Sequence, residues 1–130
     1  MRIPAKLLKA TGFVVAGPIP EVYVSFGPTG GWAGSGPGVA LTHPGAPGHR
    51  FTLSRAPGWD MEDVYVLSEL STGCGMTDGY GTMASVLEAG AANVPRIAEG
   101  IKNAIAKKRV PKGTNPTLWP AVRTRETVSK

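Results

Sequence analysis

Alternating apolar and polar positions predict several short β-strands in the first half of the chain. The first is Glu21–Phe26, in which an apolar side chain occupies every second position. Apolar residues on both faces of 63–70 favour a central place in the sheet for that segment. The other predicted strands are, in chain order, 38–42, 50–55 and a weak one at 72–77.

The apolar period changes after residue 81 and becomes that of a helix. Thr82 is a suitable N-cap, and the apolar stripe predicts a helix from there to about Lys108. Pro95 has no backbone N–H and crowds the carbonyl of Ala91, so we expect the helix to be kinked or split there. The stripe consists of Met83, Val86, Leu87, Gly90, Val94, Ile97, Ile101, Ala104, Ile105 and Lys108.

Strands followed by a helix predict an α+β fold. We expect a small antiparallel sheet of three to five strands, connected as a meander and covered on one face by the C-terminal helix. The 18 Gly and 12 Pro residues gather mainly in the loops between the predicted strands. The predicted domain is 1–109, with a short basic lead-in whose Leu7 and Leu8 can pack on it. Residues 110–130 are predicted to be a basic extended or disordered tail.

Cysteine and hydropathy content favour a cytoplasmic protein. Cys74 is the only cysteine, so no disulfide can form within the chain, as is usual in a reducing compartment. Lys9, Thr11 and Gly12 interrupt the apolar run that a signal peptide would need. No stretch approaches the roughly 20 apolar residues of a transmembrane helix. We therefore predict no membrane partner.

Charge is unevenly distributed along the chain. The net charge is +5, but 60–99 carries seven acidic and one basic residue, whereas 100–130 carries eight basic and one acidic. Lys107, Lys108 and Arg109 fall where the predicted helix ends, and cations there stabilise the helix dipole. The alternative is that these cations contact nucleic-acid phosphates. Segments of opposite charge can also attract a protein partner or a second copy of the chain.

The glycine-rich segments lack the spacing of a cofactor loop. No Gly-Lys pair occurs for a phosphate loop, and Gly34-Ser-Gly36-Pro-Gly38 does not match the dinucleotide pattern. A second cluster of glycines, at 73–81, precedes the predicted helix. It is better explained as a strand-to-helix turn than as a weak anion site. The potential metal ligands His43, His49, Cys74 and Asp78 include no closely spaced pair. We predict neither a cofactor nor a metal.

A catalytic role has little support in the sequence. Cys74 with one of the two histidines, oriented by Asp60 or Asp78, would make a nucleophile and a base. No recognised signature surrounds that cysteine, however, and the carboxylates of 60–63 are typical of a solvated acidic turn. We therefore predict no catalytic residues and no enzyme, and we keep a small cysteine-dependent enzyme as the second alternative.

A non-catalytic binding protein is the function that these observations favour. Its predicted contact surface is formed by the loops around Trp32 and His43–His49, together with the basic end of the helix. The predicted partner-binding residues are Trp32, His43, His49, Arg50, Lys107, Lys108, Arg109 and Lys112.

The layout over residues 21–108, strands first and a helix after them, resembles that of small proteins carried by phages and mobile elements. These include adaptors and anti-CRISPR or other counter-defence inhibitors. The resemblance implies a protein partner, namely a host nucleic-acid-handling complex that is blocked by stoichiometric occlusion. The first alternative is direct nucleic-acid binding through the basic C-terminal segment, and a homo-oligomer stays open as well.

Overall fold

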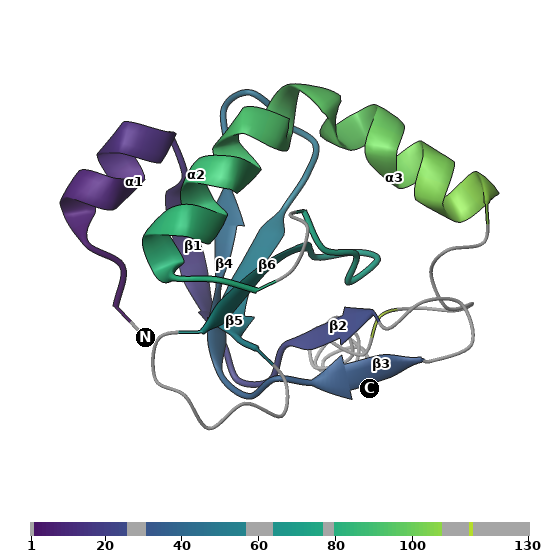
Figure 1. Cartoon of the computed structure of the whole chain (residues 1–130), viewed down its shortest axis with the longest axis horizontal. Coiled ribbons are helices and arrows are strands. Elements are labelled where there is room, and N and C mark those ends of the chain that lie inside the picture. Colours follow the sequence, from purple (N-terminus) through teal and green to yellow (C-terminus); the bar gives the residue numbers. More distant parts are fainter. Residues whose placement is uncertain (1, 26–30, 57–63, 77–79, 108–114, 116–130) are drawn as a thin grey trace, which may run out of the picture.

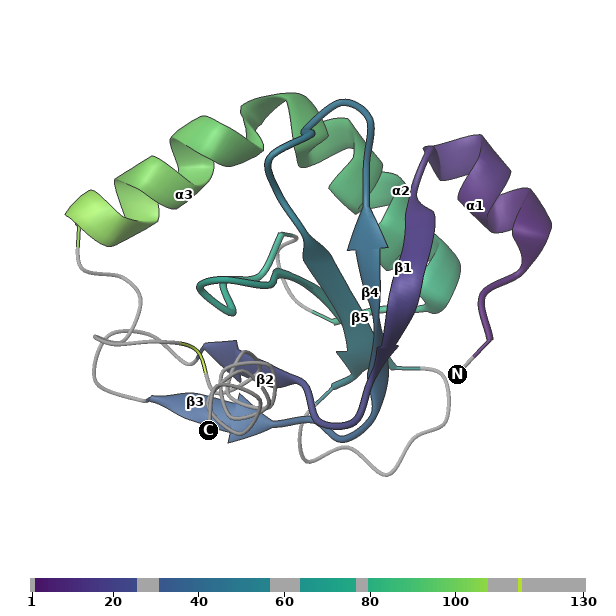
Figure 2. The same ribbon diagram turned by 180° about the vertical axis from the view of Figure 1, so that it is seen from behind.

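The computed structural model describes residues 2–25, 31–56, 64–76, 80–107 and 115. Figure 1 shows the arrangement of the helices and strands, and Figure 2 shows it from behind. The elements are, in chain order, α1 (Ala5–Thr11), β1 (Val14–Ile19), β2 (Tyr23–Ser25), β3 (Trp32–Gly34), β4 (Gly38–Thr42), β5 (Phe51–Arg55), β6 (Tyr65–Glu69), α2 (Met83–Asn93), the 3-10 turn η1 (Val94–Arg96) and α3 (Ile97–Ala106).

The main sheet has four antiparallel strands in the order β1-β4-β5-β6. Strands β4, β5 and β6 follow one another as the predicted meander. Strand β1 forms one edge of the sheet and pairs with β4. A register shift between Val15 and Gly17 interrupts this pairing. Strands β2 and β3 form a separate two-stranded sheet. The α+β fold with a small antiparallel sheet is therefore confirmed.

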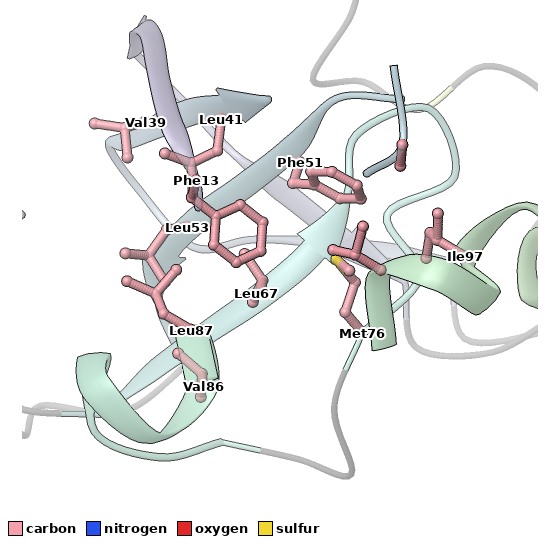
Figure 3. Close-up of a cluster of buried hydrophobic side chains, with 12 residues drawn as sticks. Phe13, Val39, Leu41, Phe51, Leu53, Leu67, Met76, Val86, Leu87 and Ile97 are labelled. Carbon is pink, nitrogen blue, oxygen red and sulfur yellow. The ribbon is translucent and has the colours of Figure 1, made fainter. Parts of the chain in front are cut away.

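The apolar face of the main sheet packs against α2 (Figure 3). Phe51 and Leu53 of β5 and Leu67 of β6 point to this face, and all three are fully buried. Gly90 lies in the middle of α2 because a Cβ at that position would overlap the side chain of Leu67. The absence of a side chain thus lets the helix approach the sheet closely. Leu7 and Leu8 of α1 pack at the border of this core, as predicted.

The C-terminal helix is split where the sequence predicts it. Thr82 caps α2 by accepting a hydrogen bond from Ser85 N at 3.1 Å. Pro95 lies within η1, which separates α2 from α3. Figures 1 and 2 show α2 along the sheet and α3 running away from it, past the turn that follows β6. Ile105 of the predicted apolar stripe is consequently 57% exposed.

The small β2–β3 sheet lies against the opposite face of the main sheet. Val22 and Val24 pack on Val66 of β6, whose side chain points away from α2. Ser25 N donates to Gly73 O at 2.8 Å, which joins β2 to the turn after β6. The main sheet is therefore covered on both faces, by α2 on one and by β2–β3 on the other.

Three sequence predictions need correction. The first strand is β1, and the segment before it forms α1. The strand predicted at Glu21–Phe26 is the second one, β2, at Tyr23–Ser25, with Phe26 outside the described residues. The proline-rich 17–20 region obscured β1, which tolerates Pro18 because it is an edge strand. Strand β6 lies at the other edge and not in the centre. Isolated bridges to Gly75 and Gly81 lie along its free side, and α2 and the β2–β3 sheet bury its two faces.

Two further predictions, the weak strand at 72–77 and the tail at 110–130, fall only partly within the described residues. The weak strand at 72–77 is reduced to the single bridge at Gly75, with Thr77 outside the described residues. Of the predicted tail only Asn115 is described. It is buried and donates to Leu70 O at 2.9 Å. Within the described ranges, no helix is long and apolar enough to cross a membrane.

Candidate functional site

Two hollows meet where the β4–β5 loop approaches the break between α2 and α3. The first has a volume of about 260 Å³ and is mainly apolar, and the second has a volume of about 240 Å³ and is more polar. Both are lined by Gly48 and His49, so they adjoin; we call them together the His49 groove. The first is completed by Gly45, Ala46, Pro47, Val94, Pro95, Ile97 and Ala98, and the second by Arg50, Glu69, Leu70 and Ser71.

His43 holds the loop that forms one wall of the groove. Its Nδ1 accepts from Gly45 N at 3.0 Å, so Nε2 carries the proton and donates to Thr11 O at 2.8 Å. Its ring also contacts Phe13 edge-on, with centroids 4.9 Å apart. Gly12 has a φ of +85°, and a side chain there would strike the imidazole. His43 is therefore a structural anchor, whose two nitrogens are both engaged.

The loop continues through two tight turns that bring His49 to the groove. Ala46 N donates to His43 O at 3.0 Å, and His49 N donates to Ala46 O at 3.1 Å. Ala46 is buried in the main core, which fixes the middle of the loop. Because its backbone is bonded at both turns, this wall is formed before any ligand binds.

The opposite wall comes from the break in the C-terminal helix. Val94 is buried at the start of η1, and Pro95 and Ala98 are exposed along the groove. An uninterrupted helix would present one straight apolar stripe to the sheet. The break at Pro95 instead turns part of this stripe toward the loop.

Glu69 is the buried carboxylate of the polar hollow. It is only 2% exposed, and its oxygens accept four hydrogen bonds. Oε1 accepts from the amide and hydroxyl of Ser71, and Oε2 accepts from the amide and hydroxyl of Thr72 at 2.8 and 2.7 Å. These bonds close the turn after β6, so the carboxylate is used internally. Half-buried His49 and exposed Arg50 are the polar side chains that a ligand can reach.

Two other predicted binding residues within the described ranges, Trp32 and Lys107, do not line the groove. Trp32 lies on β3, and its indole Nε1 donates to Thr72 O at 3.2 Å. It thus fastens the small sheet to the turn that also carries Ser71 of the polar hollow. Lys107 is the exposed C-cap of α3. The remaining predicted residues, Lys108, Arg109 and Lys112, lie outside the described residues.

Of the residues considered for catalysis, His49 lines the groove and His43 anchors its wall. Cys74 lines neither hollow, and its Sγ lies 3.8 Å from Gly75 O. Asp60 and Asp78, the acids considered as orienting groups, lie outside the described residues. In the part of the chain that the structure describes, no group of three or more His, Cys, Asp or Glu could hold a metal ion.

Sequence reasoning missed the Glu69 turn and the helix-break wall. The signal for the turn was present, because a carboxylate followed by Ser71 and Thr72 can accept hydrogen bonds from their amides and hydroxyls. No comparable signal places Pro95 and Pro47 in one hollow, since that placement depends on how the loop and the helix meet. Comparison with known proteins gives no match to a family model, a curated protein or a solved structure.

Proposed function

We propose that the protein is a non-catalytic binding protein that holds a short segment of a partner protein in the His49 groove. The observation that carries this proposal is the direct contact of an apolar hollow with a polar one across His49. Such an arrangement suits a peptide in which an apolar side chain is followed by a carboxylate. The apolar side chain would fill the space between Pro47 and Pro95, and the carboxylate would pair with Arg50.

Preorganisation supports this binding role. The hydrogen bonds of His43 and the turns around Ala46 fix the loop, so little conformational entropy is lost when a segment docks there. Glu69 accepts four hydrogen bonds that close the turn after β6, so its carboxylate is engaged within the fold. That arrangement suits a fixed binding wall better than a general base.

The resemblance of the layout to phage and mobile-element inhibitors suggests how such binding would be used. A small protein of this type would act by stoichiometric occlusion, and its target would be a host nucleic-acid-handling complex, as in anti-CRISPR inhibition. On this proposal the groove contacts a protein subunit of the complex.

The test begins with capture of partners from host extract by the tagged full-length chain and their identification by mass spectrometry. The candidate is then purified, and its affinity and stoichiometry are measured by calorimetry. Ala98→Arg should fill the apolar hollow and weaken binding at least tenfold, and Arg50→Glu should weaken it through charge reversal. Ala92→Arg is the matched control, because Ala92 is exposed on α2 and lines neither hollow.

Two results would overturn the proposal: capture of no host protein, or equal affinity of Ala98→Arg and the unaltered chain for the purified partner. Direct nucleic-acid binding is the third outcome. It would appear as affinity that falls steeply with salt, and neutralising Lys107, Lys108 and Arg109 together would reduce that slope.

A further inference from the structure

A third cavity lies at the other end of β5 from Arg50. It has a volume of about 480 Å³, and its described lining is Arg2, Ser35, Pro37, Arg55 and Tyr65. Arg50 immediately precedes β5 and Arg55 ends it, so the length of the strand separates this cavity from the His49 groove. We call it the Arg55 cavity.

Separate parts of the chain hold the Arg55 cavity in place. Arg55 and Tyr65 are cross-strand partners of β5 and β6. Ser35 is fixed by contact of its hydroxyl with Ser54 Oγ at 2.7 Å and with Val22 O at 3.2 Å. Arg2 precedes Ile3, which packs on the main core. The two arginines are thus placed by elements that the fold already requires.

The charges of the Arg55 cavity are not balanced by its described lining. Arg2 and Arg55 are exposed, and among the described residues neither forms an ion pair or a side-chain hydrogen bond. The carboxylate of Glu21 lies on the neighbouring turn, where it accepts from Gly36 N at 3.2 Å, and does not line the cavity. Two like charges that share a cavity repel each other, and a bound anion removes that repulsion.

We propose that the Arg55 cavity binds a small organic phosphate. Guanidinium groups match the oxygens of a phosphate with paired hydrogen bonds, which favours arginine at such sites. The volume is within the usual range for ligand pockets, about 300–1,000 Å³, and leaves room for an organic group beyond the phosphate. The ring of Tyr65 packs on the main core and lines the cavity with Pro37, so together they offer an apolar wall to that group.

Calorimetry on the full chain tests this proposal, with AMP as a phosphate bearing a flat organic group and adenosine as its phosphate-free match. We expect AMP to bind at least tenfold tighter than adenosine, and tighter than inorganic phosphate. Arg55→Gln and Arg2→Gln should each weaken AMP binding about tenfold, as expected for the loss of a charge-assisted contact. Arg96→Gln is the matched control, because Arg96 is exposed and lines none of these hollows, and it should leave AMP affinity unchanged. Thermal unfolding of each variant shows that the fold is retained.

Four results would overturn the proposal. These are no measurable binding of AMP, equal affinities for AMP and adenosine, equal weakening by Arg96→Gln and Arg55→Gln, and tighter binding of citrate than of AMP. A 5′-phosphorylated oligonucleotide distinguishes the source of the phosphate. If it binds more than tenfold tighter than AMP, the site serves nucleic acid and not a small ligand. None of these outcomes depends on a partner in the His49 groove. Ala98 lines that groove and not the Arg55 cavity, so Ala98→Arg can lose partner binding and still bind AMP.

Discussion

The two faces of the main sheet are both covered but differ in chemistry. On the α2 face β5 and β6 bury three large apolar side chains, namely Phe51, Leu53 and Leu67, beside the carboxylate of Glu69 at the end of β6. On the β2–β3 face the same strands bury small polar residues, namely Thr52, Ser54 and Ser68. All seven are at most 2% exposed. The difference shows that side chains buried to the same extent in this molecule do not stabilise it by the same kind of interaction.

The apolar face is held by packing, whereas the polar face is held by a few defined hydrogen bonds. On the second face the apolar cluster contains only Val22, Val24 and Val66, with Ile19 at its border. The small sheet is fastened instead through Trp32 Nε1 to Thr72 O, Ser25 N to Gly73 O, and Ser35 Oγ to Ser54 Oγ. Deletions on the first face should therefore cost much more than deletions on the second.

Leu67→Ala should give the largest loss of stability. Leu67 is fully buried against α2, and its truncation leaves a cavity beside Gly90 that the helix backbone cannot fill. We expect the free energy of unfolding to fall by about 2–5 kcal/mol. Urea denaturation followed by circular dichroism measures this change. Val66→Ala, on the other face of β6, is the comparison and should cost less; an equal cost would mean that both faces are held by packing.

Trp32→Phe should have an intermediate effect that is confined to the small sheet. It keeps an aromatic ring but removes the N–H that donates to Thr72 O, a loss of about 0.5–1.5 kcal/mol. Hydrogen exchange should accelerate at the Ser25 amide, which ties this sheet to the turn after β6, and at the Ser35 amide, which donates to Val22 O beside β2. The acceleration there should exceed that at the amides between β4 and β5. Uniform acceleration throughout the chain would contradict separate fastening of the two sheets.

The pattern of apolar positions predicted the elements whose apolar side chains recur regularly on one face, even where, as in β5, the polar face is buried too. The alternation in 50–55 and the helical stripe through Leu87 and Ile97 both survive in the structure. Strand β1 was missed because Val14 and Val15 are exposed at an edge, so no buried face imposes a period on them. The edge position of β6 was missed because bridges to Gly75 and Gly81, and not another strand, cover its free side.

The candidate sites were less predictable than the elements. The sequence drew attention to the loop His43–His49, and His49 and Arg50 do line one groove. It could not separate His43, which is consumed by bonds to Thr11 O and Gly45 N, from His49, which faces the hollow. Nor could it join Arg2 to Arg55, because residues so distant along the chain meet only through the packing of Ile3 on the core.

Ser68→Ala should have the smallest effect and the opposite sign. Ser68 is fully buried on the polar face, and among the described residues its Oγ is the only buried side-chain oxygen or nitrogen without a hydrogen-bond partner. Such a hydroxyl has lost its water without compensation, so its removal should leave stability unchanged or raise it by up to about 1–3 kcal/mol. Ser54→Ala is the matched control, because its hydroxyl bonds to Ser35 at 2.7 Å, and it should lower stability by about 1 kcal/mol. Urea denaturation of the two variants distinguishes a paired from an unpaired hydroxyl on the same sheet face. If Ser68→Ala were the more destabilising of the two, hydrogen bonding would not be what holds the polar face.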